Sequence, residues 1–346
     1  VLSSHAMEHD VNGVADPFLQ VKLLQFLRLT GKGSDVASEA MNDVLAQVAT
    51  NTDNSKNVGS AILYECVRTM NEINADDGLR LLGINTIGKF LLSSQNNTRF
   101  VALSTLLEVM QYDVGAVQRH QSTIIDCLKD PDLSIKRRSL ELTIALIDAS
   151  NVRVLVPDLL TYLDACEEEI KAELVAKLCD VLESKSPTPE WQVQVSISLF
   201  KKGKQFVPEP FAVRFIGLVT ARERSVQRDV ITSLWGELLA SLDSTTGSRI
   251  AFLSATLWCI GEYTTQLTES GVAAQQQWDL LKKLCVGSDN LNVKFYCINA
   301  SVKFAARNPQ LKASVGSFFD TLTGSINCEL QQRATEYASL LHGPES

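Results

Sequence analysis

The side chains that most often perform acid–base catalysis or bind metal ions are scarce in this sequence. Its 346 residues include four histidines, at positions 5, 9, 120 and 342. The sequence contains no glycine-rich phosphate-binding loop, no H-E-x-x-H zinc motif and no G-x-S-x-G nucleophile elbow. His5 and His9 are four residues apart, as on one helix face, but we interpret them as solvated side chains near the N-terminus. The sequence therefore predicts no catalytic residues, no metal site and no cofactor.

Basic side chains gather in two nearby segments, QRHQ and SIKRRS. Their basic members, called here the basic cluster, are Arg119, His120, Lys136, Arg137 and Arg138. A cluster of this kind can bind an acidic partner face or a phosphoinositide head group. We predict that it is a partner-binding site. The alternative is that the same side chains form ordinary salt bridges between adjacent structural repeats.

The acidic run CEEEIKAE, residues 166–173, has a simpler interpretation. Carboxylates in the first turn of a helix interact favourably with the helix dipole. We therefore interpret the run as a solvated helix start, and not as a cation site.

Most of the eight cysteines, and the four tryptophans, lie in apolar helical contexts, and no two cysteines form a C-x-x-C pair. This pattern predicts reduced thiols in the core of a cytosolic protein. We expect the tryptophans to pack in the core as well, with Trp191 partly exposed because it begins a helix.

The bulk composition is that of a folded globular protein, with 45% hydrophobic and 21% charged residues. A net charge of −8 argues against a general nucleic-acid or anionic-membrane binder, although a local basic patch is compatible with it. No apolar run approaches the roughly 18 residues that a membrane span requires. The N-terminus, VLSSHAMEHD, is not a signal peptide, and because it begins on Val-Leu without Met we expect a segment of a longer chain.

One helical register recurs along the chain. The residues that follow Leu330 at steps of 4, 7, 8 and 11 are Ala334, Tyr337, Ala338 and Leu341, which share one helix face. The same register begins at Thr98, Ile135, Ile170 and Val293. Successive first positions lie 37, 35, 123 and 37 residues apart, and 123 corresponds to three units of 41.

Two further positions of the register share residue types. The residue after the first position is basic in four of the five copies: Arg99, Lys136, Lys171 and Lys294, with Gln331 the exception. The residue at step 4 is small in four copies: Ala102, Ser139, Cys297 and Ala334, with Leu174 the exception. We expect the small residue to let neighbouring helices approach closely, and the basic residue to meet carboxylates or carbonyls of the preceding turn.

This period is long enough for two helices and two turns, which is typical of HEAT and armadillo repeats. Strand patterns are nearly absent. Partner helices are expected at 78–92, 117–130 and 226–240, and breaks at 30–35, 74–78, 184–190, 206–210 and 241–248. The sequence thus predicts an all-α fold, a right-handed α-solenoid of HEAT/armadillo-like helix pairs with about seventeen helices. We expect residues 1–346 to form a single solenoid segment.

Particular strings resemble the gamma-adaptins, the large subunits of clathrin adaptor protein complex 1. They are DPFLQVKLLQFLRLTGKG (16–33), EAMNDVLAQVATNTDNSKNVGSAILYECV (39–67), AVQRHQSTIIDCLKDPDLSIKRRSLEL (116–142), LWCIGEY (257–263) and ELQQRATEY (329–337). The resemblance covers almost the whole chain, although residues 185–250 match poorly in detail. The segment resembles the C-terminal half of the adaptin trunk.

The resemblance implies a non-catalytic scaffold that pairs with a beta-type adaptin, a medium (mu) chain and a small (sigma) chain. It also implies a contact to an Arf-type GTPase and peripheral association with trans-Golgi network and endosome membranes and clathrin-coated vesicles. There the complex selects cargo and recruits clathrin. An alternative is a stand-alone peptide-recognition or transport-receptor module, which needs a ladder of like residues along a concave face, and no such ladder appears. An enzyme ranks third because clustered catalytic groups are missing.

Overall fold

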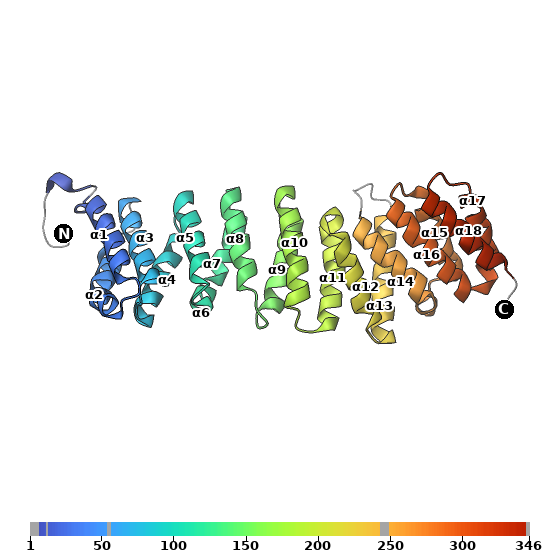
Figure 1. Cartoon of the computed structure of the whole chain (residues 1–346), viewed down its shortest axis with the longest axis horizontal. Helices are drawn as coiled ribbons and strands as arrows, with labels where there is room; N and C mark the ends of the chain where they lie inside the picture. The colour runs from blue at the N-terminus through green and yellow to red at the C-terminus, as the bar shows by residue number, and fades with distance from the viewer. Residues whose placement is uncertain (1–6, 12, 54–56, 243–248, 344–346) are drawn as a thin grey trace. The chain divides into compact units, whose positions relative to one another are not determined.

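The computed structural model describes residues 7–11, 13–53, 57–242 and 249–343, and it is almost entirely helical (Figure 1). Within these residues there are eighteen α-helices and four short 3-10 helices, and the β structure is an isolated antiparallel bridge between Val11 and Val14. This confirms the predicted all-α fold of helix pairs, with one α-helix more than expected.

The chain forms two compact units, Val1–Ile147 and Asp148–Ser346. The helices of unit 1 are α1 (Pro17–Gly31), α2 (Asp35–Asn51), α3 (Asn57–Glu72), α4 (Asp77–Phe90), α5 (Asn96–Val109), α6 (Val114–Gln118), α7 (Gln121–Asp126) and α8 (Leu133–Leu146). Those of unit 2 are α9 (Val152–Ala165), α10 (Glu168–Ser184), α11 (Pro189–Gly203), α12 (Glu209–Thr220), α13 (Arg224–Ser241), α14 (Ile250–Glu269), α15 (Ala274–Gly287), α16 (Leu291–Arg307), α17 (Lys312–Leu322) and α18 (Cys328–His342).

Local sequence explains where these helices begin. The side chains of Ser34, Asp76 and Asn327 accept hydrogen bonds from backbone N–H groups three residues later, at 3.3, 2.6 and 3.0 Å. These are N-caps, which satisfy donors that the first helical turn leaves free. Pro189 begins α11, a position at which its missing N–H costs nothing. The predicted breaks at 30–35, 74–78, 184–190 and 206–210 are confirmed, whereas most of 241–248 lies outside the described residues.

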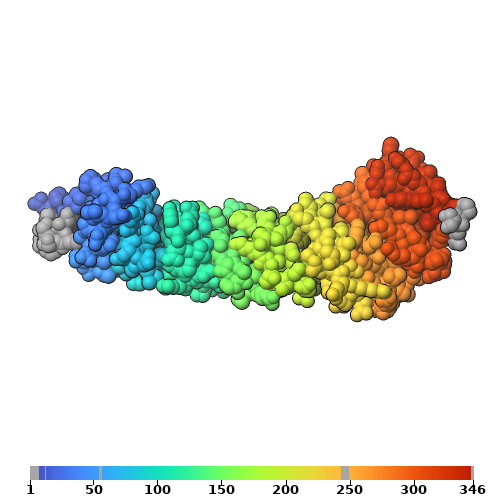
Figure 2. Space-filling model, turned by 60° about the horizontal axis from the view of Figure 1, so that its bottom comes forward, coloured from blue at the N-terminus to red at the C-terminus, as the bar shows by residue number. Residues whose placement is uncertain are grey.

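Each unit is built from two layers of helices. In unit 1, α1, α3, α5 and α8 pack on one another in chain order, and α2, α4, α6 and α7 form the other layer. In unit 2, α9, α11 and α13 pack in order within one layer, and α12, α14, α16 and α18 pack in order within the other. Within each unit, the colours of Figure 2 follow one another along the surface, because successive helices lie side by side.

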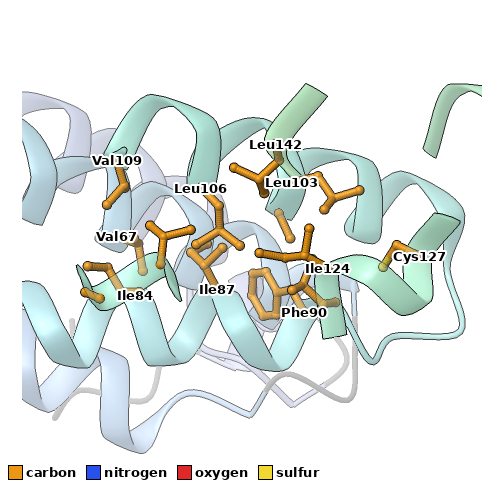
Figure 3. Close-up of a cluster of buried hydrophobic side chains, with 14 of the residues drawn as sticks. Val67, Ile84, Ile87, Phe90, Leu103, Leu106, Val109, Ile124, Cys127 and Leu142 are labelled. Atoms are coloured by element: carbon orange, nitrogen blue, oxygen red, sulfur yellow. The ribbon is translucent and has the colours of Figure 1, made fainter. Parts of the chain in front are cut away.

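The core of unit 1 lies between its two layers. Figure 3 shows Ile84, Ile87 and Phe90 of α4 together with Leu103 and Leu106 of α5 in one buried cluster. All five side chains are at most 3% exposed. Burial of such side chains supplies the main driving force that holds one helix pair to the next.

The recurrent register is confirmed as a core-facing stripe. Its copies occupy α5 and α8 in unit 1 and α10, α16 and α18 in unit 2. In α8 and α16 all five register positions are buried, and in α18 Leu330, Ala334 and Ala338 are buried. Each of the five residues at step 4 is fully buried.

The interval of 123 residues between the copies at Ile170 and Val293 contains two further copies of the repeat. Steps of 41 residues from Ile170 lead to Phe211 in α12 and Phe252 in α14, and then to Val293. Both phenylalanines are buried, and both pack against Phe200, with ring centroids 5.6 and 6.2 Å away. The repeat is therefore continuous within unit 2, although its basic residue is absent from these two helices.

One expected helix is broken. The segment 117–130 divides into the end of α6, α7 and a 3-10 turn, with the interruption at Arg119 and His120. The His120 side chain lies on Gly88 of α4, where an added Cβ would lie 2.3 Å from the imidazole Cε1. The imidazole therefore packs against α4 at the bend between α6 and α7.

Candidate interaction surface

The structure places all five members of the basic cluster in unit 1 and divides them between its layers. Arg119 and His120 form the turn between α6 and α7. Lys136, Arg137 and Arg138 lie in the first turns of α8, in the opposite layer. The surroundings of the two groups differ.

His120 is a packed side chain. Its Nε2 atom is buried and has no hydrogen-bond partner among the described residues, and its ring covers Gly88. Burial lowers the pKa of His120, and the charge of Arg119 lowers it further. The imidazole is therefore held neutral near physiological pH. This role is structural, in contrast to the exposed Arg119 beside it.

Arg138 is partly used within unit 1. Its Nη1 atom donates to the Glu141 carboxylate at 2.8 Å, and its guanidinium lies 5.4 Å from the centre of the Phe100 ring of α5. A cation above an aromatic face is attracted by the ring quadrupole. Arg138 thus connects α8 to α5. Lys136 is half-buried and Arg137 is exposed.

A basic residue outside the predicted cluster makes a largely buried ion pair in unit 1. Arg99, one residue after the first register position of α5, contacts Asp130 at 2.7 Å and donates to the Ser93 carbonyl at 2.6 Å. Both charged side chains are largely buried. In α18 the corresponding Gln331 donates to the Thr323 carbonyl at 2.9 Å. The expectation that the basic residue meets a carbonyl of the preceding turn is confirmed for Arg99, whose carboxylate partner Asp130 lies in a later turn.

The cluster therefore divides by accessibility. Arg119 and Arg137 are exposed, whereas His120 and Arg138 contribute to packing between helices. The Arg138 ion pair lies within α8 and its ring contact reaches α5, and the partner-binding interpretation stays a prediction.

Most of the other sequence features lie where expected. The carboxylates of Glu168 and Glu169 are exposed in the first turn of α10. Trp191 is half-buried, as is Trp258, which was expected in the core. Six of the eight cysteines are buried: Cys66, Cys127, Cys179, Cys259, Cys285 and Cys297. Burial raises the pKa of the Cys66 and Cys259 thiols to about 12.

The described part of the chain contains no group of potential metal ligands and no candidate membrane span. In these residues, no three His, Cys, Asp or Glu side chains lie close enough together to bind one metal ion. His5 lies outside the described residues, so its relation to His9 is not observed. No helix among the described ranges has both the length and the apolar character needed to cross a lipid bilayer.

Two surfaces were missed by sequence reasoning. Helix α1 exposes Phe18, Phe26 and Leu29 at 80, 61 and 74%. Exposed apolar patches mark contact surfaces. The second surface is a pair of cavities beside α13. Leu238 lines one of them and Leu239 lines the other. The available signal was the apolar residues themselves: Phe18, Phe26 and Leu29 in the first segment and the adjacent Leu238 and Leu239 in the second.

Comparisons with known proteins agree with this architecture. A model of the family described as "Adaptin N terminal region" matches residues 2–345. The chain is 39% identical to the AP-1 complex subunit gamma of Dictyostelium discoideum, over 98% of this chain and 39% of that protein. It is 35% identical to the AP-1 complex subunit gamma-2 of Arabidopsis thaliana, over 98% of this chain and 40% of that protein. It is 34% identical to the human AP-1 complex subunit gamma-like 2, over 98% of this chain and 44% of that protein.

Among known structures, a homology model of the full-length AP-3 complex in an intermediate open conformation contains a chain with the same fold. The TM-score is 0.69 at 16% identity, and the match covers 94% of this chain and 62% of that chain. This similarity concerns the fold alone. The chain spans about two fifths of the length of the known relatives that it matches.

Proposed function

Because the chain belongs to the adaptin family, we propose that it is a non-catalytic scaffold segment of a heterotetrameric clathrin adaptor of the gamma type. The observation that carries this proposal is the match to the adaptin N-terminal region over residues 2–345, together with the relatives named gamma. The helix-pair register supports it physically, because each pair exposes two apolar faces and must be stacked between neighbours. Such an array offers long surfaces for other chains.

We propose that the partners are a beta-type adaptin, a medium chain and a small chain, and that an Arf-type GTPase contacts the complex. In this proposal the assembled adaptor associates peripherally with trans-Golgi network and endosome membranes and with clathrin-coated vesicles. The segment supports subunit assembly and cargo sorting there. The names of the relatives, each a subunit of an AP-1 complex, support this proposal.

We also propose that residues 1–346 belong to one continuous adaptin trunk segment. The same register begins at Thr98 and Ile135 in unit 1 and at Ile170 and Val293 in unit 2. A repeat shared by both units supports a common origin in one array.

Co-purification tests the scaffold proposal. The full-length parent protein is expressed together with tagged beta-type, medium and small chains, and the bound chains are identified by mass spectrometry. We expect all three to be recovered with the parent protein. Recovery of none of them would reject the proposal.

Within the basic cluster, we propose that Arg119 and Arg137 provide the partner-binding groups. Both are exposed, whereas His120 and Arg138 are engaged in packing. Replacement of Arg119 and Arg137 by Ala in the full-length protein is expected to reduce GTPase-dependent recruitment to membranes. The matched control replaces the exposed Lys201 and Arg224 of unit 2 by Ala. Equal recruitment of wild type and the Arg119/Arg137 variant would show that the cluster is purely structural.

A further inference from the structure

Two cysteine side chains meet between α15 and α16 in unit 2. Cys285 lies in the last turn of α15, and Cys297 lies in the second turn of α16. The two helices follow each other in the chain and pack together as a hairpin (Figure 1). The thiols of the two cysteines are hydrogen-bonded to each other. Because a thiol is a short-range and weak donor, this bond places the two sulfur atoms side by side.

Burial alone does not distinguish this pair from the other cysteines of the core. Cys285 is 3% exposed and Cys297 is fully buried. Cys66 is fully buried too, but its thiol donates to the Leu45 carbonyl at 3.5 Å. A buried thiol of that kind acts as a small apolar side chain. What sets Cys285 and Cys297 apart is that each has the other thiol as its partner.

The two thiols are not equivalent. The hydrogen bond from Cys297 lowers the pKa of Cys285 against the opposing effect of burial, and the charge of Lys294 lowers it further. The same hydrogen bond and burial raise the pKa of Cys297. Cys285 therefore loses its proton more readily, while Cys297 keeps its own. The thiolate is the nucleophilic form of cysteine, so Cys285 is the sulfur that attacks first.

A cavity brings solvent close to the pair. It has a volume of about 490 Å³, and its wall includes Leu284 and Gly287 of α15 and Val293 of α16. Gly287 is exposed, so the cavity is open to solvent. These wall residues lie within about one helical turn of Cys285 or Cys297 along the chain. A small oxidant can therefore reach the neighbourhood of the pair, whereas a large one is excluded.

We propose that Cys285 and Cys297 form a redox modification site, a dithiol that hydrogen peroxide converts reversibly to a disulfide between α15 and α16. A cysteine with a resolving cysteine beside it is the usual arrangement of a redox-sensitive site in proteins. The proposal goes beyond the scaffold function and does not depend on which subunits assemble with the chain.

The reaction takes place in two steps. The Cys285 thiolate attacks one peroxide oxygen, so that an S–O bond forms, the O–O bond breaks, and hydroxide leaves and takes up the proton that Cys285 released. The Cys297 sulfur then attacks the sulfenic sulfur of Cys285, so that the S–S bond forms and the S–O bond breaks. The second hydroxide leaves with the Cys297 proton as water. Each sulfur gives up one electron, and the peroxide takes up both.

Peptide mapping tests the proposal on the native 346-residue chain. Trypsin cleaves after lysine, so Cys285 and Cys297 fall in separate peptides, residues 284–294 and 295–303. The chain is treated with hydrogen peroxide, its remaining thiols are alkylated, and it is digested without reduction. We expect the two peptides to be recovered joined, with a mass about 2 Da below their sum, because two hydrogen atoms are lost. Dithiothreitol is expected to separate them again.

Variants of the chain test the order of attack. In Cys297→Ala the sulfenic acid on Cys285 has no resolving thiol, and dimedone should capture it on the peptide 284–294. In Cys285→Ala we expect Cys297 to remain a thiol. The matched control is Cys259→Ala, which removes a fully buried thiol of α14 and should leave the yield of joined peptides unchanged. Circular dichroism melting checks that each variant is folded.

The exposed Cys328 is the internal reference for the oxidant, because peroxide reaches it directly from solvent. Recovery of the two peptides unjoined, at a peroxide concentration that oxidises Cys328, would overturn the proposal. A disulfide that joins Cys285 to another cysteine in preference to Cys297 would overturn it as well, and so would joined peptides that form only after unfolding in guanidinium. None of these results bears on subunit assembly, so failure of this proposal and failure of the co-purification are distinguishable.

Discussion

At the scale of single residues, the charged side chains of unit 1 have two different roles that their types do not reveal. Arg99 and Arg138 are held by contacts within the unit, whereas Arg119 and Arg137 are exposed. A buried charge that loses its partner destabilises the fold, while an exposed charge contributes little to stability. Stability measurements therefore separate the two roles.

The Arg99–Asp130 ion pair is expected to stabilise unit 1. Arg99→Ala leaves the buried Asp130 carboxylate without its partner and should lower the free energy of unfolding by about 3 kcal/mol. The free energy is measured by urea denaturation. The matched control is Lys129→Ala, which removes an ion pair to Asp126 that is fully at the surface and should cost less than about 0.5 kcal/mol. Similar losses in the two variants would contradict the assignment.

His120 is expected to make stability depend on pH. Its pKa is lowered in the folded chain, so the unfolded chain binds the proton more readily. The contribution of neutral His120 to the free energy of unfolding is therefore fully present above the ordinary histidine pKa of about 6.5. It is lost as the pH falls below that value. Urea denaturation of wild type and His120→Gln at a series of pH values checks this. The difference between the two should change with acidification below about pH 6.5, and a constant difference would contradict it.

At the scale of the elements, small residues allow the closest approaches between helices. Gly261 of α14 faces Ala300 of α16, and an added Cβ would lie 2.7 Å from the Ala300 Cα. Since that neighbour is backbone, the two helices would have to separate. The same logic explains why step 4 of the register is small in most copies, because a larger side chain there would separate stacked pairs.

Gly261→Ala is expected to destabilise unit 2 by about 1–3 kcal/mol, because overpacking forces α14 and α16 apart. The measurement is chemical denaturation of the 346-residue chain, followed by helical circular dichroism. Gly236→Ala in α13 is the matched control. An added Cβ there meets nothing within 4 Å, and alanine is the better helix former, so stability should rise by up to about 1 kcal/mol. Destabilisation by both substitutions would contradict the steric explanation.

At the scale of the whole molecule, charge and architecture favour protein partners. The chain carries a net charge of −8, and its basic residues form local pairs or small clusters. A repeat array also has no single core, so its surface is large for its mass and is available to other chains. Adaptin family membership agrees with this picture.

The net charge predicts that the chain does not bind double-stranded DNA at physiological salt. Non-specific binding depends on many Lys and Arg contacts to phosphates, and long-range repulsion by an acidic protein opposes it. A gel-shift titration at about 0.15 M salt checks this, and we expect no shift at micromolar protein. A histone or another strongly basic protein serves as the positive control. A salt-dependent shift with this chain would contradict the prediction.

The sequence by itself determined the helical class, the period and several helix boundaries of this protein. These features follow from local physics, since capping residues such as Ser34 and Asp76 and the apolar stripe of each helix act within a few residues. The tertiary structure decided which charges are accessible, where α6 and α7 separate, and that two cavities open beside α13. Those outcomes depend on which residues, distant in the chain, meet across the layers, as His120 meets Gly88. No local pattern encodes such meetings, because they are set by the packing of whole helices.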